Sequence, residues 1–105
     1  MFNFLKKKSI SDKKSRVHVL VEGRVQGVFY RETCRKKAQR LGVTGWVMNL
    51  KDGKVEAVFE GEEVLVNKMV DWAKRGSIFA SVDSFNVLEE DYKEEFKTFG
   101  IRYDL

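Results

Sequence analysis

The sequence predicts an α+β fold of the split-βαβ, ferredoxin-like type, an antiparallel sheet with two helices on one face. Two observations predict it. Hydrophobic residues alternate with polar ones in several short segments and recur at helical spacing in two longer ones. These segments follow one another in the order β-α-β-β-α-β, with a short additional strand at the C-terminus. Because proteins with this fold have many different functions, the fold alone does not indicate the function.

The first strand and the first helix flank a short loop. Valine occupies every second position from Val17 to Val21, which predicts a half-buried strand that ends at Gly23. The helix that follows has an apolar face with spacing i, i+4 and i+7, formed by Cys34, Ala38 and Leu41. Gly42 is expected to end this helix.

The second and third strands are predicted to form a hairpin. Residues 43–49 precede an Asp52-Gly53 turn, and apolar residues alternate again in residues 54–60. Asp-Gly between two such segments is the strongest short-range signal for a hairpin. Gly61 ends the third strand.

The last third of the chain contains a helix and two strands. The helix is predicted over residues 62–75, and its apolar face comprises Val66, Met69, Val70 and Ala73. In the strand within residues 79–88 the alternation is interrupted around Ser84, which favours a β-bulge. Residues 89–95 form an acidic connection, and residues 99–103 alternate as a short terminal strand.

The charge of the chain is unevenly distributed. The 105 residues include 20 Lys+Arg and 16 Asp+Glu, and a net charge of +4 would favour a nucleic-acid partner. Residues 1–16 hold six basic residues and one acidic residue, so the other 89 hold 14 basic and 15 acidic ones, a net charge of −1. We therefore expect a basic, disordered tail over residues 1–15, a folded domain over residues 16–105, and no bound nucleic acid.

The composition also excludes other classes of protein. No apolar segment approaches the roughly 18–20 residues of a transmembrane helix, and we expect no stable membrane association. A single cysteine cannot form an internal disulfide, which favours the cytoplasm. One histidine, one cysteine and no acidic cluster at ligand spacing do not make a transition-metal site. A monomer is the default expectation.

One loop carries the strongest functional signal. Gly23 and Gly27 lie four residues apart between the first strand and the first helix, so that successive backbone N–H groups can point inward. Such a nest at a helix N-terminus binds phosphate or carboxylate. Arg31 follows in the first helical turn, where a cation opposes the helix dipole unless an anion lies between them. The alternative is a tight turn whose arginine only covers the surface, and the spacing alone leaves both open.

Asn49 is the second candidate site residue. It lies at the end of the second strand, where its carboxamide can donate and accept hydrogen bonds at once. Asparagine is also common at strand ends as a turn residue, so a structural role fits equally well. Trp46, on the same strand, is expected in the core.

These segments resemble the acylphosphatases, a family of small enzymes that hydrolyse the carboxyl-phosphate bond of acyl phosphates. The resemblance extends from Val17 to Tyr103 and rests on four segments: GRVQGVFYR (23–31), LGVTGWVMN (41–49), DGKVEAVFEG (52–61) and FGIRY (99–103). The first is close to the family signature. The resemblance implies hydrolysis of small acyl phosphates to carboxylate and inorganic phosphate, without a metal or an organic cofactor.

The resemblance also implies roles for individual residues. The phosphate would be held by the backbone amides of the loop, which comprises Arg24, Val25, Gln26, Gly27, Val28, Phe29 and Tyr30. Arg31 would grip the phosphate oxygens with its planar guanidinium, and Asn49 would hold the attacking water in line with the scissile P–O bond. No second pocket is evident, so we expect broad tolerance of acyl groups.

No general base stands out in the sequence. The leaving group of an acyl phosphate is good and phosphoryl transfer is usually loose, so positioning and charge stabilisation can carry most of the catalysis. We therefore expect the proton to go to the substrate itself. A loss of rate on replacing His18, Glu22 or Glu32 would indicate a side-chain base instead.

The chain departs from the family pattern in three places. Residues 76–79 lack the proline that often follows the second helix. Met48 and Leu50 flank the asparagine where polar or hydroxyl residues are common, so a supporting hydrogen bond there is missing. Residues 104–105 extend past the tyrosine that often closes these chains, which affects any contact between the C-terminal carboxylate and Arg31.

Three other interpretations have less support. Cys34 and Arg40 have the Cys-x5-Arg spacing of cysteine-dependent phosphatases, but a glycine-free helix between them would separate the two side chains by about 120°. An RNA-binding module would need a basic-aromatic pattern that the third strand lacks. A non-catalytic acyl-phosphate sensor would not need a residue such as Asn49 to position a water. His18, on the opposite face of the first strand from the valines, is expected to be structural.

Overall fold

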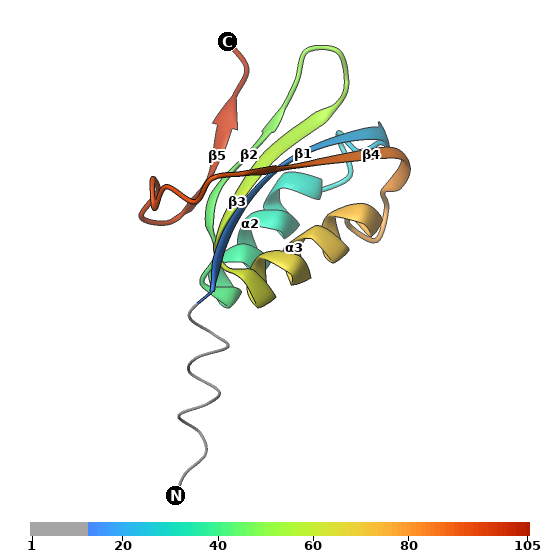
Figure 1. The fold of residues 1–105 in the computed structure, drawn as a ribbon. Helices are drawn as coiled ribbons and strands as arrows, with labels where there is room; N and C mark the ends of the chain where they lie inside the picture. Colours follow the sequence, from blue (N-terminus) through green and yellow to red (C-terminus); the bar gives the residue numbers. More distant parts are fainter. Residues whose placement is uncertain (1–12) are drawn as a thin grey trace, which may run out of the picture.

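A five-stranded sheet carries two helices on one face (Figure 1). The computed structural model describes residues 13–105. Its elements are β1 (Lys14–Arg24), α2 (Tyr30–Leu41), β2 (Thr44–Asn49), β3 (Val55–Glu62), α3 (Glu63–Arg75), β4 (Ser81–Glu90) and β5 (Phe99–Tyr103). Their order confirms the predicted ferredoxin-like fold. Most of the predicted disordered tail, residues 1–12, lies outside the described residues.

The sheet is mixed, with the strand order β4-β1-β3-β2-β5. Three pairs of neighbours are antiparallel, but β2 and β5 pair in parallel, with Asn49 opposite Tyr103. The prediction of an antiparallel sheet is therefore wrong at this edge. The reason is that β4 ends where β2 begins, and residues 91–98 then cross the sheet so that β5 starts beside the first residues of β2 (Figure 1).

Two details of the strands refine the predicted boundaries. β1 begins three residues earlier than the predicted start, because Lys14 and Ser15 pair with the last residues of β3. The register between β1 and β4 shifts beside Ser84, where Asp83 is the extra residue of β4, and this confirms the predicted bulge.

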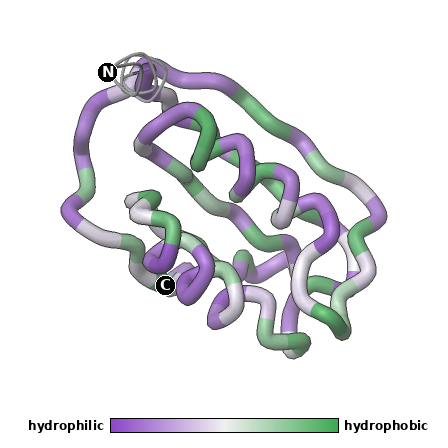
Figure 2. The backbone as a smooth tube through the Cα atoms, turned by 90° about the horizontal axis from the view of Figure 1, so that it is seen from below, coloured by the Kyte–Doolittle hydropathy of each residue, from purple (hydrophilic) through white to green (hydrophobic). Residues whose placement is uncertain are grey.

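The core lies between the sheet and the two helices, and hydropathy alternates along the chain accordingly (Figure 2). The predicted apolar positions lie in it or border on it: Val17, Val19, Val21, Cys34, Ala38, Leu41, Val66, Met69, Val70 and Ala73. The Cys34 side chain is fully buried, and burial raises the pKa of its thiol well above the usual range. Cys34 is therefore a packing residue and not a nucleophile.

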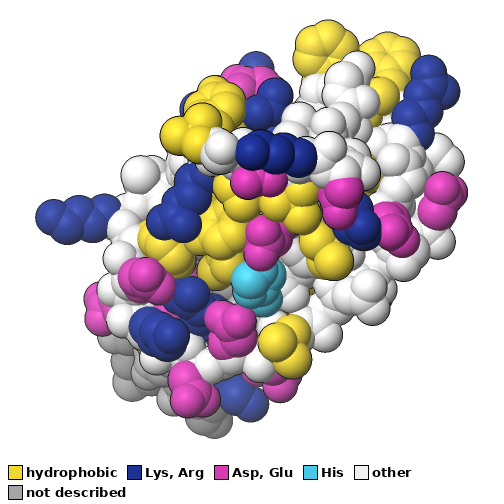
Figure 3. Space-filling view, turned by 90° about the horizontal axis from the view of Figure 1, so that it is seen from above, with side chains coloured by type: hydrophobic (Ala, Val, Ile, Leu, Met, Phe, Trp, Pro, Cys, Tyr) yellow, Lys and Arg dark blue, Asp and Glu magenta, His cyan; other side chains and the backbone are white. Residues whose placement is uncertain are grey.

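The opposite, open face of the sheet holds a network of charges (Figure 3). His18 lies between two carboxylates, with Nε2 2.5 Å from Glu56 Oε2 and Nδ1 3.1 Å from Glu90 Oε2. Trp46 is buried on this face and not in the core as predicted, because its ring packs edge-on against His18 and lies under the guanidinium of Arg102. This arrangement accounts for His18 as a structural residue.

Glu60 anchors the segment that crosses the open face. Its buried carboxylate accepts hydrogen bonds from the backbone N–H groups of residues 93, 94 and 95, at 2.6, 3.0 and 2.9 Å. Burial alone would raise the pKa of Glu60, but these donors and Arg16 outweigh it, so the pKa is lowered. The carboxylate therefore stays ionised and fixes the connection that leads to β5.

Candidate active site

The C-terminal ends of β1, β2 and β5 meet the N-terminus of α2 at one end of the sheet. A pocket of about 380 Å³ opens there. It is lined by Val25, Gly27, Phe29, Tyr30, Arg31, Glu32, Asn49, Ile101 and Tyr103. The two residues singled out from the sequence, Arg31 and Asn49, thus lie in one pocket although β2 and α2 are separate elements.

The loop between β1 and α2 curls around this pocket. Gly27 and Phe29 both have positive φ, 74° and 65°, on either side of Val28. A left-handed conformation is costly for phenylalanine, by about 1–3 kcal/mol, and such strain concentrates at functional sites. The backbone N–H groups of residues 25–29 have no hydrogen-bond acceptor within residues 13–105. The loop therefore presents unpaired donors that suit an anion.

Side chains that point away from the pocket hold this loop in place. Gln26 Nε2 donates to the carbonyls of Leu50 and Lys54, at 2.7 and 2.9 Å, which ties the loop to the β2–β3 hairpin. Ser77 Oγ donates to the carbonyl of Val28 at 2.5 Å from the other side. Of the seven predicted loop residues, Val25, Gly27, Phe29 and Tyr30 line the pocket, whereas Gln26, Val28 and the exposed Arg24 do not.

Arg31 is a half-buried cation in the first turn of α2. No carboxylate within 4.0 Å pairs with it in the described part of the chain. Its guanidinium lies over the ring of Tyr103, 5.7 Å from the centroid. A cation without an anionic partner, in the same pocket as unpaired N–H donors, is an arrangement that suits an anion with several oxygens.

Asn49 reaches the same pocket from the end of β2. Its Oδ1 atom is buried and has no hydrogen-bond partner within residues 13–105. Leaving such an acceptor unpaired costs about 1–3 kcal/mol, so it calls for a donor from outside the chain. A water or a substrate hydroxyl in the pocket would supply that donor.

Glu32 is the one carboxylate among the pocket-lining residues. It forms an ion pair with Arg35 on the next part of the helix, and this hydrogen bond lowers the pKa of Glu32. A lowered pKa makes the carboxylate a weak base. The other two candidate bases are outside the pocket, since His18 lies on the open face and Glu22 contacts Lys54.

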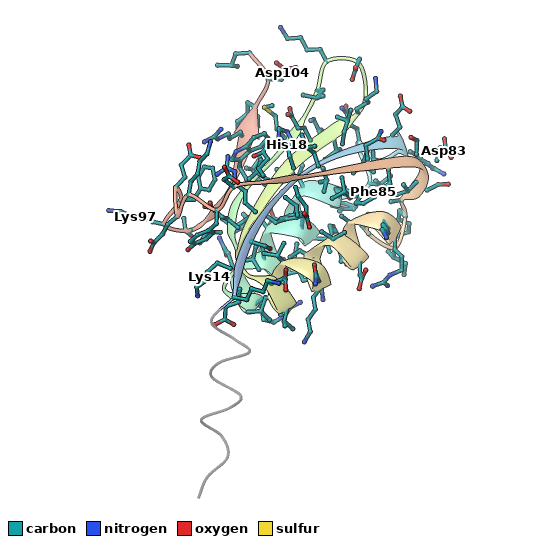
Figure 4. All side chains as sticks on the ribbon, in the orientation of Figure 1. Lys14, His18, Asp83, Phe85, Lys97 and Asp104 are labelled. Carbon is teal, nitrogen blue, oxygen red and sulfur yellow. The ribbon has the colours of Figure 1, made fainter. Side chains whose placement is uncertain are left out.

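The C-terminal residues tie β5 to the β2–β3 hairpin. The backbone N–H of Lys51 donates to Asp104 Oδ2 at 3.1 Å, and Lys51 Nζ donates to the main-chain oxygen of Leu105 at 2.9 Å. Asp104 lies at the tip of the C-terminal strand in Figure 4, at the end of the molecule opposite Lys14. The last two residues thus contact Lys51, and Arg31 meets the Tyr103 ring in place of a terminal carboxylate.

Comparison with known proteins identifies the family. A family model described as acylphosphatase matches residues 17–101. The chain belongs to the acylphosphatase family. It is 53% identical over 89 residues to an acylphosphatase of Syntrophus aciditrophicus, a match that covers 85% of this chain and 93% of the relative. This confirms the resemblance drawn from the signature segments.

Solved acylphosphatases share the fold. The structure of an acylphosphatase from Coxiella burnetii superposes with a TM-score of 0.80 at 40% identity, over 86% of this chain and 94% of the other. That from Bacillus subtilis gives a TM-score of 0.80 at 36% identity, over 85% and 99%. The protein is thus a hydrolase that acts on acyl phosphates and releases inorganic phosphate.

Between residues 13 and 105 there is no group of three or more His, Cys, Asp or Glu side chains placed to hold a metal ion. Neither α2 nor α3 is long and apolar enough to span a membrane.

Proposed function

We propose that this acylphosphatase hydrolyses small acyl phosphates without a metal ion, with Arg31 and the backbone amides of residues 24–30 holding the phosphate and Asn49 holding the water. The observation that carries the proposal is the buried, unpartnered Oδ1 of Asn49 in the same pocket as an arginine without a carboxylate partner. The Asn49 oxygen lacks a hydrogen-bond donor, and the Arg31 guanidinium lacks an anion. A phosphate with a water beside it satisfies both.

The phosphate-binding part of the site uses backbone and side chain together. The unpaired N–H groups of residues 25–29 and the N-terminus of α2 provide fixed partial positive charge. Arg31 adds a full charge and a planar pair of donors that matches two phosphate oxygens. These donors are in place before the substrate binds, so little reorganisation is needed as charge shifts in the transition state.

The water-binding part of the site lies at the end of β2. Asn49 Oδ1 accepts a hydrogen bond from the water, which orients a lone pair towards phosphorus. The water oxygen attacks phosphorus, the P–O bond to the acyl group breaks, and the electron pair leaves with the carboxylate. Because the leaving carboxylate is a weak base, the transition state is loose and the water proton can pass to a phosphate oxygen of the substrate.

The proposal also covers the partners, the cellular location and the oligomeric state of the enzyme. The near-neutral charge of the chain beyond residue 16 supports a protein that does not bind nucleic acid. The single, buried cysteine supports a cytoplasmic location. We propose a monomer, because the pocket is built entirely from residues of one chain.

Hydrolysis of acetyl phosphate in the presence of a chelator tests the proposal. We expect the same rate with chelator as with added Mg²⁺, and the Glu32→Gln variant should keep at least half of the wild-type rate. The matched control is Glu63→Gln, a variant of a glutamate in the first turn of the other helix. Activity that requires a metal, or a loss of more than tenfold in Glu32→Gln alone, would contradict the proposed mechanism.

A further inference from the structure

Three large apolar side chains are exposed next to the pocket. Phe29, Ile78 and Phe79 are 70%, 89% and 61% exposed, and we call them the apolar strip. The rings of Phe29 and Phe79 pack against each other with centroids 6.4 Å apart. Adjacent exposed side chains of this size are uncommon on a soluble protein and mark binding surfaces.

The apolar strip is continuous with the active site. Phe29 lines the pocket and also contacts Phe79, so the strip begins inside the site and leads out of it. Phe29 is held at the N-cap of α2 in its left-handed conformation. A ligand bound in the pocket that extends beyond it on this side therefore meets the strip.

The segment that carries Ile78 and Phe79 is fixed against the phosphate-binding loop. The buried Ser77 hydroxyl bonds the carbonyl of Val28. A Cβ at Gly76 would lie only 2.7 Å from the ring of Tyr30, and this residue has a φ of 77°, so the close approach requires glycine. The strip is therefore prepared before a ligand binds.

The geometry of the reaction directs the acyl group towards this strip. Asn49 lies on β2, next to the β5 edge of the sheet, whereas Phe79 lies two residues before the start of β4 at the opposite edge (Figure 1). In an in-line displacement the leaving oxygen lies opposite the attacking water. With the attacking water held by Asn49 as proposed, the acyl oxygen would leave away from β2, towards the β4 side of the sheet, where Phe79 packs against Phe29.

We infer that the acyl phosphates this site takes best carry an extended apolar acyl chain, which lies across Phe29, Phe79 and Ile78. The inference rests on the proposed function, because it uses the proposed position of the water. It replaces the expectation of broad acyl tolerance with a preference that rises with chain length. Acetyl phosphate is too short to reach Ile78 and Phe79.

The test is the kcat/KM of the wild-type enzyme for acetyl, butyryl, hexanoyl and octanoyl phosphate. A fully buried methylene contributes about fourfold to binding and one half-covered on an open surface about twofold. We expect kcat/KM to rise about twofold per methylene as far as hexanoyl phosphate, with most of the change in KM. A flat series in wild type overturns the inference.

Variants locate the effect on the strip. Phe79→Ser and Ile78→Ser should lower the ratio of hexanoyl to acetyl kcat/KM at least fivefold, whereas Phe79→Leu should keep most of it. The matched control is Leu88→Ser, since Leu88 is 63% exposed on β4 but outside the pocket. Circular dichroism and thermal unfolding show that each variant is folded. A ratio that stays at the wild-type value in both serine variants overturns the inference.

The outcome separates the two proposals. Wild-type enzyme that does not hydrolyse acetyl phosphate without a metal contradicts the proposed function. Hydrolysis of acetyl phosphate without any dependence on chain length contradicts only the role of the apolar strip.

Discussion

Arg16 and Arg31 are two arginines at the N-terminal parts of β1 and α2, and they have opposite surroundings. Arg16 is 8% exposed and is within 4.0 Å of three carboxylates, those of Glu60, Glu90 and Glu95. Arg31 has no carboxylate partner among residues 13–105 and contacts the ring of Tyr103 instead. Carboxylates within residues 13–105 neutralise the first cation, and we propose that a bound phosphate neutralises the second.

The contrast separates residues that stabilise the fold from residues that bind substrate. Arg16 donates hydrogen bonds to all three of these carboxylates. The hydrogen bonds that Glu90 accepts from Arg16 and His18 lower its pKa. The pocket that holds Arg31 is lined by loop residues with unpaired N–H donors and by Asn49, whose carboxamide oxygen is unpaired within residues 13–105. Polar groups with hydrogen-bond or ion-pair partners indicate a structural role, and unpaired polar groups in a pocket indicate a functional one.

The largest effect on activity is expected from replacing Arg31 by alanine. Arg31→Ala should lower kcat/KM for acetyl phosphate about 1,000-fold, because it removes charge stabilisation of the transferring phosphoryl group. Its free energy of unfolding should change by less than about 1 kcal/mol, because Arg31 forms no ion pair within residues 13–105. Arg40→Ala, on the same helix, is the control. Loss of the fold in Arg31→Ala would contradict the account.

Arg16→Ala should have the reverse effect. Removing one partner of a buried ion pair costs about 3–5 kcal/mol. Because Glu90 and Glu95 are partly exposed, we expect a loss of about 2 kcal/mol in the free energy of unfolding. The remaining folded enzyme should keep the wild-type KM. Urea unfolding and steady-state kinetics on one preparation measure both, and a changed KM would show that Arg16 also acts on the site.

The aromatic contact of Arg31 should have an intermediate effect. A cation over a ring is worth about 0.5–1 kcal/mol at an exposed position, so Tyr103→Ala should raise KM about fivefold. Tyr103→Phe keeps the ring and should behave like wild type. If both variants lose the same activity, the hydroxyl group and not the ring face acts on Arg31.

The smallest effect is expected from residues 1–12. The described chain starts at the end of β1 that is about 33 Å from the loop, given the rise of ten residues in a strand. A chain that starts at Lys13 should keep kcat and KM within a factor of two. It retains the hydrogen bond from the Glu63 N–H to the Lys13 carbonyl, so its melting temperature should also be close to that of the full chain.

Local patterns predicted most of this molecule. Alternation and helical spacing predict each helix and strand found in residues 13–105, and the glycine-flanked loop with Arg31 predicts an anion site. The parallel β2–β5 pair and the face occupied by Trp46 were not predictable, because both depend on residues 91–98 crossing the sheet. The contacts of Tyr103 with Arg31 and of Phe79 with Phe29 were not predictable for a similar reason, since each joins segments that are distant in the sequence.

Binding of inorganic phosphate to the Asn49→Ala and Arg31→Ala variants tests the central claim most directly. The claim is that Arg31 supplies the missing charge for the phosphate while Asn49 supplies only the acceptor for water. Calorimetric titration should give Asn49→Ala a phosphate Kd within about threefold of wild type, together with a kcat at least 100-fold lower. Arg31→Ala should show no measurable binding. Loss of phosphate binding in Asn49→Ala, or wild-type affinity in Arg31→Ala, would contradict the account.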